Sequence, residues 1–268
     1  MSTVLHISDP HFGTEQAPVA EALVSLCHAQ RPTLVVLSGD ITQRARSDQF
    51  AAARRFVDRL GAPWLALPGN HDIPLWNWWA RARHPYARYA AAFGPDLEPV
   101  HRSDELLVVG VNTTRPWRHT HGEVSAQQVE RVAHLLATAR PEQLRMVVVH
   151  QPVAVVRTRD AHNLLRGKDA ALQRWAEAGA DLVLGGHIHL PYVMRLQGLA
   201  RPMWAVQAGT AVSSRVRAEA PHSVNLLRWA PAQENGQCQI ERWDYAAPAG
   251  AFRHADTFSI SSVHRNIR

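Results

Sequence analysis

Five short motifs of the sequence carry residue types that bind metal ions. One of them, "LPGNHDIP" at positions 67–74, places an amide, an imidazole and a carboxylate side by side. The motif residues that could do chemistry are Asp9 and His11 in "SDPH", Asp40 in "SGD", Asn70, His71 and Asp72 in "GNHD", His150 in "VVVH", and His187 and His189 in "GGHIH". Imidazole, carboxylate and amide groups without a thiolate suit Mn, Fe or Zn rather than an iron–sulfur cluster. The sequence therefore indicates a site for divalent or trivalent metal ions.

Each motif stands directly after a short apolar run that we interpret as a β-strand. The runs "TVLHIS", "TLVVLS" and "WLALP" alternate with helical patterns over 17–29 and 48–60, as in βαβ units. The 48–60 helix is predicted to have Ser47 as its cap and Gly61 just past its end. Because ligands bind at the carboxyl ends of the strands in an open α/β sheet, the motif residues are expected to converge in one crevice.

The remaining apolar runs complete two sheets. "LLVVGVN" and a helix over 125–138, opened by a Ser125/Gln128 capping box, precede the runs "LRMVVVH" and "DLVLGGH". After about residue 190 the runs are closely spaced, which predicts antiparallel strands with Asn235-Gly236 as a hairpin turn. We expect two mixed sheets packed face to face with helices outside. This is a four-layer α/β/β/α sandwich, in a single domain over residues 1–268.

Seven of the motif residues could supply oxygen or nitrogen ligands, which suits two metal ions better than one. The ions of such pairs lie about 3.5–4 Å apart, a gap that one carboxylate can bridge. Asp40, alone after its strand, is the expected bridge. Asp9 and His11 could bind one ion from a single short loop, whereas His187 and His189 could bind different ions.

This ligand set predicts the hydrolysis of a phosphoester. Water bound to such a metal pair can ionise near neutral pH and attack phosphorus. Asn70 can bind a metal ion through its amide oxygen, while the neighbouring His71 points into the cleft and donates a proton to the leaving alkoxide. We expect Asp72 to hold the His71 ring in place.

The ordered motifs resemble the calcineurin-like metallophosphoesterase superfamily, whose pattern is Asp-x-His, Gly-Asp, Gly-Asn-His-Asp, His and Gly-His-x-His. All five blocks are present in order, over roughly residues 3–190. The resemblance implies the sandwich fold expected above and two metal sites, which members of the family fill with Fe, Mn, Zn or Co. By this resemblance the first ion is bound by Asp9, His11, Asp40 and His189. The second is bound by Asp40, Asn70, His150 and His187.

Within the superfamily, "GNHD" and "GDITQRARSDQF" look most similar to the bacterial class III cyclic-nucleotide phosphodiesterases, a group that includes glycerophosphodiesterases. Small phosphodiesters, with cyclic nucleotides first, are therefore the expected substrates. A second interpretation is a UDP-2,3-diacylglucosamine-type pyrophosphate hydrolase, although the usual members of that group carry Arg where His71 stands. A third is a non-catalytic interaction module on the same fold. The intact ligand set and His71 argue against that module.

Several residues outside the motifs could contact the substrate. Arg44 and Arg115 are predicted to bind its phosphate. The stretch 74–94 is rich in Trp and Arg, and a proline divides it into two short helices. It could cover a sheet edge, form a lid or homodimer surface over the cleft, or make peripheral membrane contact with acyl chains. His119 and His121 imitate a metal pair, but we interpret them as surface histidines.

Composition limits the partners and the compartment. The 268 residues carry a net charge of +6, almost entirely from arginine because Lys168 is the only lysine. This charge favours a small phosphorylated substrate, while the lack of any five-residue basic block argues against dedicated nucleic-acid binding. No leader and no run of roughly 18 apolar residues is visible, so we expect a cytoplasmic protein. Cys27 and Cys238 are too few for a disulfide framework, and Cys27 is predicted to be a core thiol.

Overall fold

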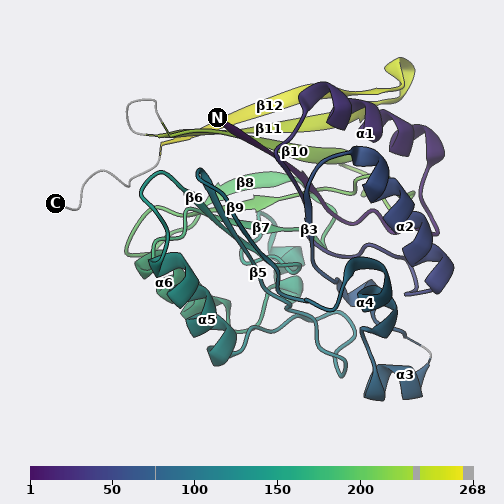
Figure 1. Ribbon diagram of the computed structural model, residues 1–268, viewed down its shortest axis with the longest axis horizontal. Helices are drawn as coiled ribbons and strands as arrows, with labels where there is room; N and C mark the ends of the chain where they lie inside the picture. The colour runs from purple at the N-terminus through teal and green to yellow at the C-terminus, as the bar shows by residue number, and fades with distance from the viewer. Residues whose placement is uncertain (76, 232–235, 262–268) are drawn as a thin grey trace.

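Two six-stranded sheets pack face to face in the computed structural model, which describes residues 1–75, 77–231 and 236–261 (Figure 1). The first sheet has the order β12-β11-β10-β1-β2-β3, with strands β1 (Ser2–Ile7), β2 (Leu34–Leu37), β3 (Trp64–Ala66), β10 (Ser223–Ala230), β11 (Gln237–Ala246) and β12 (Ala251–Ser261). The second has the order β4-β5-β6-β7-β9-β8, with strands β4 (Val100–Arg102), β5 (Leu106–Gly110), β6 (Leu144–Val148), β7 (Leu182–Gly185), β8 (Tyr192–Arg195) and β9 (Trp204–Gln207).

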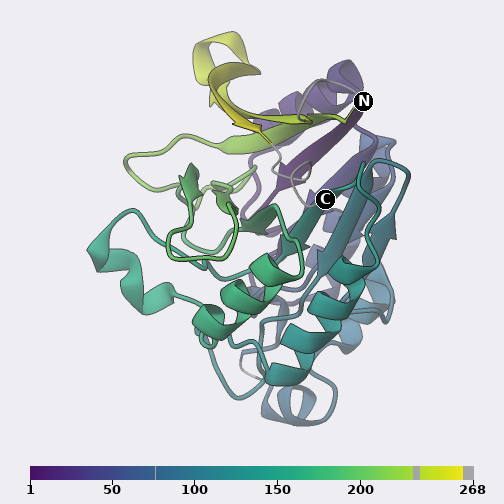
Figure 2. The same ribbon diagram turned by 90° about the vertical axis from the view of Figure 1, so that its left-hand side faces the viewer.

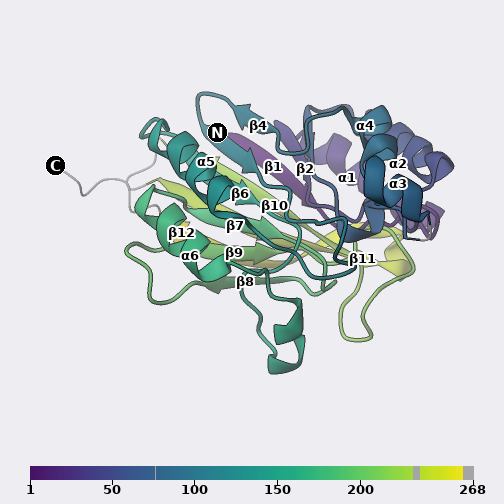
Figure 3. The ribbon, with the colours of Figure 1, turned by 90° about the horizontal axis from the view of Figure 1, so that it is seen from below.

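Helices cover the outer face of each sheet. The α-helices are α1 (Ala17–Gln30), α2 (Ser47–Leu60), α3 (Trp78–Arg83), α4 (Ala87–Phe93), α5 (Ala126–Ala137) and α6 (Lys168–Glu177), and the short 3₁₀ helices are η1 (Asn70–Asp72), η2 (Thr158–Asn163) and η3 (Ala247–Ala249). Seen from below, α1 to α4 lie on one side of the sheets and α5 with α6 on the other (Figure 3). Figure 2 shows α5 and α6 side by side on the second sheet. The predicted α/β/β/α sandwich is confirmed.

Side-chain alternation along the strands builds three apolar layers. In β1, Val4 packs between the two sheets, whereas Leu5 and Ile7 pack outward among residues of α1 and α2. In β5, Val108 joins the layer between the sheets and Leu107 packs outward with residues of α5 and α6. Because successive strand residues point to opposite faces, apolar residues on both faces require cover on both sides. The four layers follow from this pattern.

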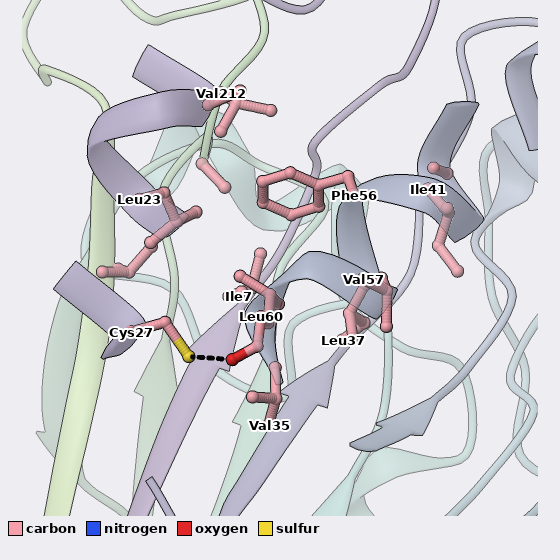
Figure 4. Close-up of a cluster of buried hydrophobic side chains, with 14 of the residues drawn as sticks. Ile7, Leu23, Cys27, Val35, Leu37, Ile41, Phe56, Val57, Leu60 and Val212 are labelled. Carbon is pink, nitrogen blue, oxygen red and sulfur yellow. Dashed lines mark hydrogen bonds between the residues drawn. The ribbon is translucent and has the colours of Figure 1, made fainter. Parts of the chain in front are cut away.

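The outer layer under α1 and α2 contains the predicted core thiol (Figure 4). Cys27 lies 1% exposed on α1, and its Sγ donates a hydrogen bond to the Leu60 carbonyl at 3.4 Å. Burial raises the pKa of the Cys27 thiol to about 11, so the group stays protonated and apolar. Cys238 is also free and buried.

Most of the predicted helix ends are confirmed. Gly61 ends α2 in the left-handed region with φ of 66°, and Ser125 forms the capping box with Gln128 at the start of α5. Pro85 separates α3 from α4. The prediction that Ser47 caps α2 is wrong. The extended residue before the helix is Arg46, and Ser47 is already helical.

The region after residue 190 is only partly antiparallel. β10, β11 and β12 pair antiparallel, as does β8 with β9. However, β9 pairs with β7 in parallel, so the prediction is wrong for this strand. The Asn235-Gly236 turn falls partly outside the described residues. Within the described ranges, no helix combines the length and apolar character that a transmembrane span requires.

Removing the Phe56 ring should destabilise the fold strongly. Phe56 is 4% exposed in the layer under α1 and α2, so Phe56→Ala should lower the free energy of unfolding by about 3–5 kcal/mol through lost burial and a cavity. Urea denaturation followed by circular dichroism measures this change. Phe258→Ala, at a residue that is 37% exposed on β12, is the control. Equal losses in the two variants would contradict the assignment of Phe56 to the core.

Candidate metal centre

The carboxyl ends of the parallel strands meet at one edge of the two sheets. β1, β2 and β3 run parallel in the first sheet, and β5, β6, β7 and β9 run parallel in the second. The residues that follow these strands form three groups whose ligand atoms lie within 4.8 Å of one another: Asp9, His11 and His189; His11, Asp40 and His71; and Asp40, His150 and His187. The structure therefore brings the predicted metal-binding side chains together.

In the first group, nitrogen and oxygen atoms of Asp9, His11 and His189 lie close enough to share one ion. His189 Nε2 lies 3.2 Å from Asp9 Oδ1 and 3.1 Å from His11 Nε2. His11 Nε2 in turn lies 3.7 Å from Asp40 Oδ2. Ligand atoms that share one ion at about 2.0–2.2 Å are expected to lie roughly 3–4 Å from each other, so these separations suit one ion.

A second group lies on the other side of Asp40. His150 Nε2 is 3.2 Å from Asp40 Oδ1 and 3.2 Å from Asn70 Oδ1, and His187 belongs to the same cluster. Asp40 therefore presents Oδ2 to the first group and Oδ1 to the second. This is the geometry expected of a bridging carboxylate.

Unpartnered buried atoms support a cation in both groups. Among the described residues, Asp9 Oδ1 and His187 Nδ1 are buried without a hydrogen-bond partner. Buried polar atoms rarely lack partners, and each unpaired one requires an explanation such as an ion. One atom belongs to each group, so the residues present fit two metal ions.

Backbone carbonyls orient two of the imidazoles. His150 Nδ1 donates to the Ser38 carbonyl at 2.8 Å, and His189 Nδ1 donates to the Arg215 carbonyl at 2.5 Å. Because a carbonyl only accepts, each ring carries a proton on Nδ1 and turns its Nε2 toward the site. Asp9 is fixed similarly, since its Oδ2 accepts from the Ser8 hydroxyl and the His187 backbone N–H.

The chain turns sharply at the ligand positions. Left-handed φ values between 42° and 72° occur at Asp9, His11, Asp40, His187 and His189. Non-glycine residues adopt this region at a cost of order 1–3 kcal/mol each, and such strain collects at functional sites. The strained turns aim the side chains that follow each strand into the common space.

Glycines of the motifs permit the close approach of the loops. A Cβ on Gly69 would lie 2.0 Å from the Asp40 backbone nitrogen, and a Cβ on Gly186 would lie 1.8 Å from the Ser8 hydroxyl oxygen. Neither contact leaves room for any side chain. The glycine of "GNHD" and the second glycine of "GGHIH" are therefore packing requirements of the site.

Burial and charge set the protonation of the histidines. Burial lowers the pKa of His11 and of His187 to about 3, so both rings are neutral. Burial also lowers the pKa of His150, but the Asp40 carboxylate outweighs it and raises this pKa to about 9. His150 therefore holds a proton at neutral pH unless a metal ion displaces it.

The His71 ring forms the third cluster, with His11 and Asp40. Its Nδ1 lies 2.9 Å from the Gln43 carbonyl, and the Arg215 guanidinium lies 3.1 Å from its Nε2. Its backbone N–H donates to Asp40 Oδ1 at 2.8 Å. The ring centroid is 4.8 Å from that of His11. Both ring nitrogens thus have neighbours other than the ligand atoms.

The expectation that Asp72 holds the His71 ring is wrong. The Asp72 carboxylate accepts hydrogen bonds from the backbone N–H groups of Gly69, Ile41 and Thr42 and from the Thr42 hydroxyl, at 2.7–3.0 Å. These donors come from the loops after β2 and β3. Asp72 therefore fastens together the loops that carry Asp40 and Asn70, and the Gln43 carbonyl contacts the His71 ring instead.

The two arginines predicted to bind the phosphate lie in different surroundings. Arg44 is exposed, and its charge reaches His119 near the site. The Arg115 guanidinium donates to the Asn112 and Thr114 carbonyls and to Gln128 at the start of α5. The sequence does not predict Arg215, although its guanidinium contacts His71 and its carbonyl orients His189. Arg215 follows the "WAVQAG" run, and only the parallel direction of that strand places it at the site.

Comparisons with known proteins agree with this geometry. A family model described as calcineurin-like phosphoesterase matches residues 2–191. A cAMP/cGMP dual specificity phosphodiesterase of Mycobacterium tuberculosis is 29% identical over 206 residues, which cover 69% of this chain and 61% of the relative. A 3',5'-cyclic adenosine monophosphate phosphodiesterase of Escherichia coli is 25% identical, covering 76% of each chain.

Solved structures show the same fold at low identity. A dimetal phosphatase from Danio rerio superposes with a TM-score of 0.69 at 15% identity, covering 97% of this chain and 99% of that one. The family model spans the five motifs and most of the strands that position them. The predicted family is confirmed, and the chain belongs to the calcineurin-like phosphoesterase family.

Proposed function

We propose that the protein is a metal-dependent phosphodiesterase that hydrolyses small phosphodiesters of the cyclic nucleotide or glycerophosphodiester type. The observation that carries this proposal is the Asp40 carboxylate, which presents one oxygen to each of two groups of lone-pair donors. His71 lies beside both groups. The named activities of the relatives from M. tuberculosis and E. coli support this substrate class.

Two metal ions, Mn, Fe or Zn, fit the donor sets. The first ion would be held by Asp9, His11, Asp40 and His189, and the second by Asp40, Asn70, His150 and His187. When bound, such a pair polarises the phosphate and lowers the pKa of a coordinated water. The family uses divalent metals, and the identity of the pair is part of this proposal.

His71 is assigned the role of general acid. Its Nδ1 lies against the Gln43 carbonyl and its Nε2 against the Arg215 guanidinium. Its backbone N–H donates to Asp40 Oδ1, which holds the residue beside the donor groups. From there a protonated ring nitrogen can reach the leaving oxygen and transfer its proton.

Arg215 is assigned to the phosphate. Its guanidinium lies between Gln43, at 3.1 Å from the side-chain oxygen, and His71. A guanidinium has several N–H donors, so it can contact a phosphate oxygen while it keeps one of these neighbours. Arg44 adds a second positive charge on the exposed side, and Arg115 remains the weaker candidate because its donors are engaged elsewhere.

A UDP-2,3-diacylglucosamine-type pyrophosphate hydrolase is the second candidate. The exposed indoles of Trp78 and Trp79 on α3 favour it, since Trp side chains suit a membrane surface. His71 argues against it. A non-catalytic module is disfavoured because all seven candidate ligands are present and their ligand atoms cluster. We also expect a cytoplasmic location, and we keep a homodimer and peripheral membrane contact as proposals.

A substrate panel tests the choice. Purified protein with measured metal content is incubated with Mn and cyclic AMP, a glycerophosphodiester, a nitrophenyl phosphodiester or a UDP-linked diacylglucosamine. Turnover of a natural small diester is expected. Turnover of the UDP lipid alone would replace the leading proposal by the second candidate.

Metal affinity should depend on pH. His150 must lose a proton before its Nε2 can bind metal, and its pKa of about 9 lies above neutral pH. Lowering the pH below 9 should therefore weaken Mn binding, by about tenfold per pH unit for each proton displaced. Calorimetric titrations at pH 6, 7 and 8, in buffers of different ionisation enthalpy, measure affinity and proton release. Identical affinity at pH 6 and pH 8 would contradict the role of His150 as a ligand.

Asp40→Ala should empty both metal sites, because each donor group includes one of its oxygens. We expect less than one equivalent of metal after dialysis, measured by plasma mass spectrometry, against two for the wild type. Glu15→Gln is the control, since Glu15 is an exposed carboxylate outside the donor groups. Retention of two equivalents by Asp40→Ala would refute the bridging assignment.

His71→Ala should keep both metal ions and lose turnover according to the leaving group. Loss of the proton donor is expected to slow a diester with an alkoxide leaving group by about 10²–10⁴-fold. A nitrophenolate leaving group needs little protonation, so that substrate should lose far less. Steady-state kinetics on both substrates give the comparison. Equal losses with metal retained would remove His71 from the role of general acid.

A further inference from the structure

A cavity of about 570 Å³ lies between α3 and the loop after β5. One wall presents Leu75, Trp78 and Arg81, and the other presents Pro116, Trp117 and His119. The volume falls within the range of small-molecule sites, roughly 300–1,000 Å³. The metal donor sets use none of these residues.

The cavity lies beside the candidate metal centre. Its first wall begins three residues after Asp72, and its second follows the carboxyl end of β5 at the same edge of the sheets. The loop of the second wall leaves β5 past Thr113, whose Oγ1 accepts a hydrogen bond from the His150 backbone N–H at 3.4 Å. Burial and then the charges of His71 and Arg81 lower the pKa of His119. His119 therefore lies within electrostatic reach of both the proposed acid and the cavity arginine.

The walls are tied together before any ligand arrives. The Arg81 guanidinium donates to the Pro116 carbonyl at 2.5 Å, to the Pro74 carbonyl at 3.1 Å and to the Arg118 carbonyl at 2.9 Å. The bonds to Pro116 and Arg118 connect α3 to the opposite loop, and the bond to Pro74 connects α3 to the segment before it. A cavity with walls braced in this way loses little conformational entropy on binding, which favours a specific ligand.

The lining matches a flat, polar-edged ring. Trp78 is 80% exposed and Trp117 is 73% exposed, so both indoles present free faces at the cavity. Any nucleobase can stack on an aromatic side chain, and such stacking contributes about 1–3 kcal/mol to binding, which is about 5- to 150-fold in affinity. The His119 imidazole and the two Arg81 N–H groups that the three carbonyls leave over are polar, and a polar-edged ring satisfies such groups better than an acyl chain does. The described lining therefore favours a nucleobase over a lipid tail.

We propose that this cavity is the subsite for the nucleobase of a nucleotide-derived phosphodiester, whose phosphate lies at the metal centre. This inference rests on the proposed function, because it names the nucleoside attached to the phosphate that the metal centre would hydrolyse. The occupant is a purine or pyrimidine ring stacked against Trp78 and Trp117, next to His119.

The test compares a nucleotide with its phosphate alone. Binding of AMP and of inorganic phosphate to the Mn-loaded protein is measured by calorimetry for the wild type, Trp78→Ala, Trp117→Ala and Trp79→Ala. Trp79 is the matched control because it is also on α3 and 73% exposed, but it faces Arg83 and does not line the cavity. Trp78→Ala and Trp117→Ala should each weaken AMP about 5- to 150-fold. Their affinity for phosphate, which also reports correct folding, should stay within about twofold.

Three results would overturn the subsite. These are unchanged AMP affinity in both cavity variants, an equal loss in Trp79→Ala, or a loss of binding to anionic phospholipid vesicles in Trp78→Ala with AMP retained. The last result would assign the indoles to a membrane. Hydrolysis of a nitrophenyl phosphodiester by the wild type is measured in parallel. Its absence would count against the proposed function, whereas the AMP-to-phosphate comparison still decides the subsite.

Discussion

The concentration of lone pairs around the Asp40 carboxylate is the constraint on which the rest of the structure depends. Buried imidazole nitrogens and carboxylate oxygens lie 3.1–3.7 Å apart there, in an arrangement that brings acceptors together. Burial alone would raise the pKa of Asp40, but the charge of His150 outweighs it and keeps this pKa well below its usual range. The side chains therefore need an external scaffold that prevents them from moving apart.

Two rigid sheets and a set of strained turns provide that scaffold. The parallel strands deliver the loops to one edge, and the left-handed residues turn each side chain inward at an energetic cost. Four hydrogen bonds to Asp72 lock the loops after β2 and β3. The apolar layers on both faces of each sheet offset this local cost, so an arrangement unfavourable by itself persists in the folded chain.

The metal-binding residues and the proposed base subsite lie in different parts of the molecule. The donor groups follow β1, β2, β3, β6 and β7, each of which is fixed by a parallel neighbour. The proposed base subsite is built from α3 and the loop after β5, at the periphery in Figure 1, and three hydrogen bonds of Arg81 hold its walls. Changes in these two segments can alter the accepted substrate without disturbing the metal ligands.

Local pattern determined much of the architecture and most of the candidate site. Apolar runs followed by Asp, Asn or His predicted the strands and their converging ends, because period and spacing are properties of short segments. The direction of β9 came only with the tertiary structure, since strand direction depends on a distant neighbour, and with it came Arg215 at the site. The partners of Asp72 were likewise decided by a loop 30 residues away in sequence, whose backbone N–H groups reach it only after the sheets have formed.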